Sequence, residues 1–165
     1  MSSFLPDNYE APASWGNYLK FKKGTTKIRI LSSSIQGYLD WKENKPIRTR
    51  EKQNAIDPER KPKHFWAFIV WDYEESKLKI CEITQKGIQD SIYNLYKDED
   101  WGDPTTYDLK ISKEWDGMDT KYAVVASPKK DITEEMEKAY KNANIYLEAL
   151  FEWDDPFNFT PSTPF

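Results

Sequence analysis

The chain has one cysteine and one histidine among its 165 residues, which limits the chemistry it can support. Cys81 cannot form an internal disulfide, and its position in the apolar run LKICEI predicts a buried thiol. Cys81 and His64 are too few for a structural zinc site, and any Ser-His-Asp triad would depend on His64 alone. A glycine-rich phosphate loop is also absent. We therefore expect a protein that is not an enzyme and that uses no metal ion or cofactor.

The sequence also lacks the segments that direct a chain into or across a membrane. No run of about 18 apolar residues occurs, so no membrane-spanning helix is expected. The first residues, MSSFLPDNYEAPAS, contain neither a basic region nor an apolar core typical of a secretory signal. The length suits one domain with a tail, and we expect a soluble, intracellular protein.

The net charge of −4 conceals two regions of opposite sign. From Lys20 to Lys63 there are 13 basic and 5 acidic residues, a net charge of +8. From Asp131 to the end there are 2 basic and 8 acidic residues, a net charge of −6. This segregation indicates a body that binds a polyanion and an acidic C-terminal end.

Alternating apolar residues predict a mainly β chain with two helices. In the segment TKIRIL, Ile28 and Ile30 fall on one face, and Lys27 and Arg29 fall on an outer, positive face. The expected strands are a first pair or one bent strand within Trp15–Leu31, followed by Gly37–Trp41, His64–Tyr73, Leu78–Ile83, Tyr107–Trp115 and Thr120–Ser127. The expected helices are Thr84–Lys97, capped by Thr84, and residues 129–151, capped by Thr133.

Short strands with a helix inserted among them fit the OB fold, a five-stranded Greek-key barrel. We expect an N-terminal arm at residues 1–14 and the OB-fold domain at 15–128. The C-terminal helix and a flexible acidic tail at 152–165 follow.

Residues 42–73 combine a basic loop with an aromatic strand. The loop KENKPIRTREKQNAIDPERKPK has eight basic residues, four acidic residues and three prolines. Its apolar residues follow neither a helical nor a strand period. Five of the ten residues in HFWAFIVWDY are aromatic. Single-stranded nucleic acids need cations for phosphates and flat rings for unpaired bases, so we interpret this region as their binding site.

The residues predicted to contact the nucleic acid form two groups. The phosphate-binding cations are Lys20, Lys22, Lys23, Lys27, Arg29, Lys42, Lys45, Arg48, Arg50, Lys52, Arg60, Lys61 and Lys63. The base-stacking rings are Trp41, Trp66, Phe68, Trp71 and Tyr73. Both faces of the strand His64–Tyr73 are apolar, which indicates that each is covered by protein or by ligand. The alternation of side chains along this strand does not decide which of its two faces stacks bases.

Other interpretations remain open. The loop could be a solvated insertion, and the rings could belong to the core or to a surface for protein partners in the replication machinery. The run Asp98-Glu99-Asp100 with Asp103 could hold magnesium in a nuclease, although such runs more often end a helix.

Several motifs, in order, resemble the tailed-bacteriophage single-stranded DNA-binding proteins. They are Trp15…Asn17-Tyr18-Leu19-Lys20…Gly24…Lys27–Leu31, Gly37-Tyr38…Trp41, Pro46-Ile47-Arg48…Arg50, Phe65–Trp71, Glu82–Lys86, Asp100–Pro104…Tyr107-Asp108 and Thr120…Tyr122. The resemblance implies an OB-fold core that coats and protects single-stranded DNA, without sequence specificity, during phage replication, recombination or repair. It places the protein in the cytoplasm of an infected bacterial host. The zinc of some relatives does not carry over, because its ligands are absent here.

The C-terminal tail resembles the acidic tip of bacterial single-strand-binding proteins, which ends in Pro-Phe and recruits replication enzymes. In this chain Asp154, Asp155, Pro156 and Phe157 lie within the tail, and Phe165 ends it without neighbouring acids. The resemblance implies that these residues bind phage replication proteins. The charge of the segment also allows it to fold back and compete with DNA.

Overall fold

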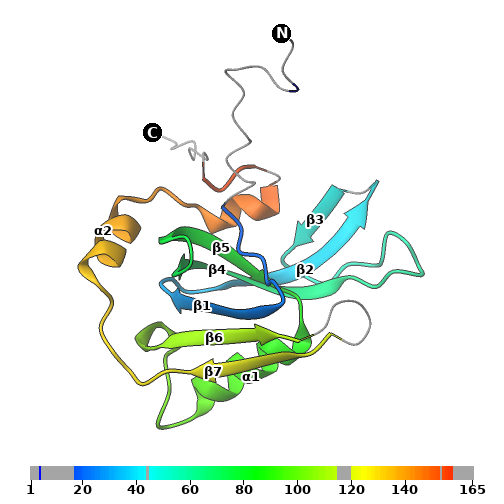
Figure 1. The fold of residues 1–165 in the computed structure, drawn as a ribbon. Helices are drawn as coiled ribbons and strands as arrows, with labels where there is room; N and C mark the ends of the chain where they lie inside the picture. The colour runs from blue at the N-terminus through cyan, green and yellow to red at the C-terminus, as the bar shows by residue number, and fades with distance from the viewer. Residues whose placement is uncertain (1–3, 5–16, 44, 115–119, 153, 158–165) are drawn as a thin grey trace.

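The computed structural model describes residues 4, 17–43, 45–114, 120–152 and 154–157 (Figure 1). The strands are β1 (Gly24–Ile30), β2 (Ile35–Lys42), β3 (Lys45–Thr49), β4 (Lys63–Asp72), β5 (Lys77–Ile83), β6 (Asp108–Lys113) and β7 (Tyr122–Ala126). The helices are α1 (Lys86–Lys97) and α2 (Glu134–Asn142), with short 3-10 turns η2 (Pro104–Thr106) and η4 (Leu147–Glu152). The prediction of a mainly β chain is confirmed.

Strand β4 is the centre of the sheet, because β1 and β2 both pair with one of its edges and β5 pairs with the other. Ile30 lies opposite Val70 and Ile35 lies opposite Ala67, so the β1–β2 side has two residues more than β4 over this stretch. Extra residues of this kind bend a strand. Within the bend, the Ser32 hydroxyl accepts a hydrogen bond of 2.8 Å from the Ile69 amide. Strands β1 and β2 are therefore two halves of one bent strand.

From β5 the pairing continues through β4, β1 and β6 to β7, and α1 lies between β5 and β6 in the sequence. A barrel would require the two ends of this path to meet. Among the pairings of the described residues, none joins β5 to β7. The five-stranded OB barrel therefore stays a prediction.

The inner core lies on one face of the sheet, beneath α1. Ile28 and Ile30 of β1 are buried there, as are Leu109 and Ile111 of β6, as their alternation predicted. Helix α1 adds Ile88 and Ile92, and the Cys81 thiol is fully buried, as predicted.

A second core covers the opposite face of β4. Phe65 and Ala67 of β4 pack there with Leu150 of η4, and the rings of Phe65 and Phe151 are 5.9 Å apart. Gly37 makes this close packing possible, because a Cβ at that position would lie 2.9 Å from a Phe151 ring carbon. Both faces of β4 are thus covered by protein, one by α1 and the other by the C-terminal segment.

Three local predictions were wrong. The basic loop contains β3, which was missed because Pro46 and its short length conceal an edge strand (Figure 1). Helix α1 is preceded by Gln85, with no side-chain cap from Thr84. Helix α2 is capped by Thr133 as predicted, but it ends at Asn142, and η4 then forms a separate turn.

Within the described residues, no helix is both long and apolar enough to cross a membrane.

Candidate nucleic-acid interface

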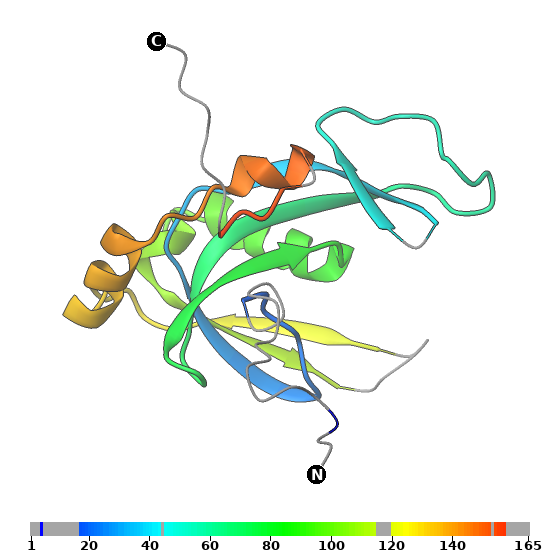
Figure 2. The same cartoon turned by 90° about the horizontal axis from the view of Figure 1, so that it is seen from above.

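Residues 42–63, here called the basic arm, extend from one side of the sheet (Figures 1 and 2). The arm comprises the β2–β3 turn, β3 and the segment that returns to β4. The buried Asp40 carboxylate anchors the returning segment, since it accepts a hydrogen bond of 3.0 Å from the Ile56 amide. An Asp57 turn follows, in which the Arg60 amide donates to the Asp57 carbonyl at 2.9 Å. The arm is therefore built onto the sheet at several points.

Most of the predicted phosphate-binding cations lie on the surface. Ten of them are exposed: Lys20, Lys22, Lys23, Lys42, Lys45, Arg50, Lys52, Arg60, Lys61 and Lys63. Seven of these ten belong to the arm, and the other three precede β1. Their contacts with phosphate stay predictions, and their exposure is what such contacts require.

Arg48, Lys27 and Lys22 of the predicted set already have acidic partners. The Arg48 guanidinium makes two hydrogen bonds to the Glu82 carboxylate, at 2.6 and 3.3 Å. Lys27 lies 3.8 Å from Asp108, and Lys22 lies 3.9 Å from Glu74.

The prediction that Arg29 projects into solvent is wrong. Its side chain is 2% exposed, and Asp108 lies directly opposite on β6 with a guanidinium–carboxylate distance of 3.4 Å. Arg29 also donates to the carbonyls of Thr105 at 2.9 Å and Lys130 at 2.6 Å. The chain after β7 runs over this face of β1. The alternation in TKIRIL correctly separated the two faces of the strand, but it did not reveal that the face with Arg29 is also covered.

Asp108 is the centre of this buried polar cluster. The Tyr73 hydroxyl donates to it at 2.7 Å, and the Lys130 ammonium lies 2.9 Å away. Burial alone raises the pKa of Asp108, but these hydrogen bonds and the neighbouring positive charges outweigh it and lower the pKa. Burial and the Asp108 carboxylate both raise the pKa of Tyr73. The Lys27 ammonium lies 4.3 Å from the centre of the Tyr73 ring, so this ring already has a cationic partner.

The structure separates the five predicted stacking rings. Phe68 is 2% exposed in the inner core and Trp71 is 4% exposed, so neither can receive a base in this conformation. Trp41 is half-buried beneath the Arg60 guanidinium, at 5.2 Å from the ring centre. Trp66 is also half-buried and lines a groove beside α1. Trp41 and Trp66 are thus the accessible tryptophans of the set.

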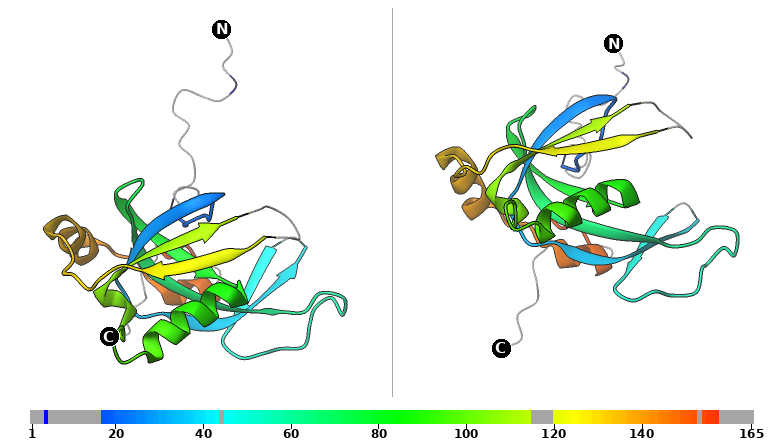
Figure 3. Two further views of the ribbon diagram at one scale, coloured as in Figure 1. Left: turned by 60° about the horizontal axis from the view of Figure 1, so that its bottom comes forward. Right: turned by 90° about the horizontal axis from the view of Figure 1, so that it is seen from below.

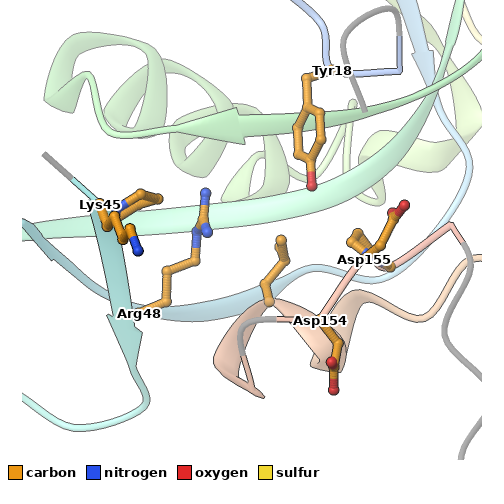
Figure 4. Close-up of a pocket in the computed structure, with 8 residues that line it drawn as sticks. Tyr18, Lys45, Arg48, Asp154 and Asp155 are labelled. Carbon is orange, nitrogen blue, oxygen red and sulfur yellow. The ribbon is translucent and has the colours of Figure 1, made fainter. Parts of the chain in front are cut away.

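The C-terminal segment lies against the arm (Figure 4). The Glu148 carboxylate accepts a hydrogen bond of 2.7 Å from Arg50, whose guanidinium lies 4.3 Å from the centre of the Phe151 ring. A cavity of about 370 Å³ separates Lys45 and Arg48 from Asp154, Asp155 and the ring of Tyr18, as Figure 4 shows. The acidic segment therefore faces the basic strand β3.

The predicted partner-binding residues of the tail are held in part by the body. Pro156 is buried, and the Phe157 ring contacts Tyr18 edge-on at 6.0 Å between centroids. Phe165 lies outside the described residues. Recruitment of a partner by these residues stays a prediction.

Sequence reasoning missed a tyrosine-rich groove between α1 and the β1–β2 bend. Tyr93 and Tyr96 are 52% and 54% exposed, and Tyr140 of α2 lines the same groove. The available signal was the spacing of Tyr93 and Tyr96, which are three residues apart and therefore neighbours on the surface of α1.

The acidic run after α1 forms turns. Asp98 accepts from the Asp100 amide at 2.7 Å, and Asp103 accepts from the Thr105 amide at 2.9 Å. In the part of the chain that the structure describes, no group of three His, Cys, Asp or Glu side chains is placed to hold a metal ion.

Comparison with known proteins gives one informative similarity. A probable ssDNA-binding protein of Escherichia phage T5 is 28% identical over 141 residues, which cover 65% of this chain and 53% of the relative. The chain thus spans about half the length of that relative. No protein-family model matches the chain, and no solved structure matches it.

Proposed function

We propose that this protein binds and protects single-stranded DNA with little sequence preference during phage replication, recombination or repair, without acting as an enzyme. The observation that carries the proposal is the basic arm, which has seven exposed cations, one of which, Arg60, lies 5.2 Å from the centre of the half-buried Trp41 ring. Phosphates need the cations and unpaired bases need the ring. The similarity to the probable ssDNA-binding protein of phage T5 supports the same function, in the cytoplasm of a bacterial host.

An OB-type architecture fits this proposal. The path β5-β4-β1-β6-β7, the bent strand made of β1 and β2, and the position of α1 between β5 and β6 match a five-stranded barrel with one inserted helix. In this arrangement, the basic arm is an enlarged connection between the first two strands of the barrel. The L12 loop that joins these two strands is one of the regions through which OB folds bind oligonucleotides.

We propose that the acidic C-terminal segment regulates access to the arm or recruits replication proteins. The Glu148–Arg50 ion pair and the Phe151 ring beneath Arg50 support the first role, because a carboxylate and a ring occupy the places that a phosphate and a base would take. Deleting Glu152 to Phe165 should tighten binding to single-stranded DNA at low salt. Unchanged affinity would contradict competition by residues 152–165 and leave recruitment as their role. Glu148 and Phe151 stay in place in this deletion, so their competition with DNA is tested separately by Glu148→Gln.

The test of the main function is a fluorescence titration with oligo-dT at two salt concentrations, since the chain contains seven tryptophans. We expect quenching at low salt, and the logarithm of the affinity should fall with the logarithm of salt by roughly 0.7 per phosphate contacted. Parallel titrations with RNA would measure the preference for DNA. Absence of quenching at low salt would refute the proposal, and affinity independent of salt would favour a protein-interaction module.

A further inference from the structure

A groove lies beside α1, away from the covered outer face of β4. Figure 3 shows α1 between β7 and the ribbon formed by β2 and β4. The groove has a volume of about 760 Å³, and its walls include Trp66 of β4, Tyr93 and Tyr96 of α1 and Tyr140 of α2. Besides the buried Phe68, four aromatic side chains that are at least partly exposed thus line this groove.

This groove adjoins a second hollow that supplies positive charge. Ile30, Leu31 and Thr105 line both, so the two lie side by side and are together called the path. The second hollow, of about 600 Å³, is lined by Lys129 and Lys130, which are both exposed. Lys130 also contacts Asp108, whereas Lys129 forms no ion pair with the other described residues. One end of the path is therefore cationic and the other aromatic.

The rings stand beside polar groups that can reach the edges of bases. Gln36 lies directly opposite Trp66 in the β2–β4 pairing, and Ser33 and Ser34 line the same wall. The Lys97 ammonium lies 5.7 and 5.6 Å from the ring centres of Tyr93 and Tyr96. Rings flanked by cations, amides and hydroxyls suit unpaired bases better than an apolar peptide.

Acidic residues also border the path, at Asp103 and Asp131. Asp103 accepts hydrogen bonds from the amide and the hydroxyl of Thr105, so its carboxylate is engaged in its own turn. Asp131 lies on the hollow that holds the two lysines.

We propose that single-stranded DNA occupies this groove, with bases stacked on Trp66, Tyr93 and Tyr96 and phosphates held by Lys129 and Lys130. The inference rests on the proposed function and gives the DNA a second contact region besides the basic arm. The face that carries Trp66 continues along the β2–β4 ribbon to Tyr38 and His64, whose rings are 5.3 Å apart and which lie opposite each other. This face leads toward the arm, so one strand of DNA can contact both regions.

Photocrosslinking tests this path directly. The full-length protein is bound to oligonucleotides containing 5-iododeoxyuridine, irradiated, and digested for mass spectrometry. We expect crosslinks at Trp66, Tyr93 or Tyr96. Crosslinks confined to residues 42–63 would overturn the inference.

Affinity measurements on variants give an independent readout. The double variant Tyr93→Ser/Tyr96→Ser should bind oligo-dT at least about fivefold more weakly, since loss of one stacked base costs that much or more. Tyr93→Phe/Tyr96→Phe keeps the rings and should bind like wild type. Tyr146→Ser is the matched control, because Tyr146 is 39% exposed and lies outside the groove.

The outcomes separate the two proposals. If wild type binds oligo-dT and the serine double variant binds equally well, the groove proposal is wrong and the arm alone accounts for binding. If wild type does not bind at low salt, the proposed function itself is wrong. Both altered side chains are more than half exposed, so thermal unfolding should be nearly unchanged and a loss of affinity can be assigned to the groove.

Discussion

The basic arm and the Asp108 cluster both contain cations from the same positive stretch of sequence, yet they place them in opposite environments. In the arm, Lys42, Lys61 and Lys63 are exposed and have no ion-pair partner among the described residues. In the cluster, Arg29 is 2% exposed and bound to Asp108. Removing a buried cation weakens the compensation of the buried acid beside it, whereas removing an exposed cation leaves the fold intact. The comparison shows that cations of one stretch divide into structural and ligand-facing groups according to burial.

The largest expected effect comes from Arg29→Met. Loss of the guanidinium removes one of the positive groups around the buried Asp108 carboxylate and leaves the carbonyls of Thr105 and Lys130 without their Arg29 donor. The free energy of unfolding should therefore fall by about 3–5 kcal/mol. Urea denaturation measures this change in the free energy of unfolding. Lys45→Met in the arm, at an exposed position, should change stability by less than about 0.5 kcal/mol. Equal losses of stability in the two variants would contradict the division into structural and ligand-facing cations.

The next effect concerns Tyr73 and the pH dependence of stability. Because the folded-state pKa of Asp108 is lowered from 3.8, its contribution is present above pH 3.8 and is lost as the pH falls through the lower folded value. Tyr73→Phe removes one of the hydrogen bonds that lower this pKa and should cost about 1.5 kcal/mol at neutral pH. Its stability should also decline less steeply below pH 3.8 than that of wild type, as measured by denaturation at several pH values. An unchanged slope would show that Tyr73 does not stabilise the charged form.

A smaller effect, on DNA binding, is expected when two lysines of the arm are neutralised. Lys61→Gln/Lys63→Gln should leave stability unchanged and reduce the salt slope of DNA binding by about 1.4, if each lysine contacts one phosphate. The matched control is Lys86→Gln/Lys121→Gln, which alters two exposed lysines outside the arm. Equal loss of affinity in both variants would mean that binding follows total charge and not the arm.

The smallest effect is predicted for Glu148→Gln. The Glu148–Arg50 pair is exposed on both sides, so its loss should change stability by less than about 1 kcal/mol. The substitution should tighten DNA binding slightly, by up to about fivefold, because Arg50 becomes available to phosphate. Titration with oligo-dT measures the change, and weaker binding would contradict competition by the C-terminal segment.

Local patterns predicted much of the fold but less of the candidate site. The alternation at Ile28, Ile30, Leu109 and Ile111 correctly identified buried faces. The same pattern could not reveal that the opposite face of β1 is covered, because that depends on a segment that arrives after β7. The burial of Trp71, which was predicted to stack a base, was not visible from the local pattern either. The groove rings lie on different elements, Trp66 on β4, Tyr93 on α1 and Tyr140 on α2, so no local pattern joins them.

The sequence by itself determined the strand periods, the Thr133 cap, the burial of Cys81 and the separation of positive from negative regions. These properties depend on residues that are close together in the chain. Tertiary structure alone decided which cations face solvent and which rings remain accessible. Arg29 and Asp108 are 79 residues apart, and Arg50 and Glu148 are 98 apart. Whether a charge is buried or exposed depends on such distant partners, because desolvation is a property of the folded surroundings and not of the neighbouring residues.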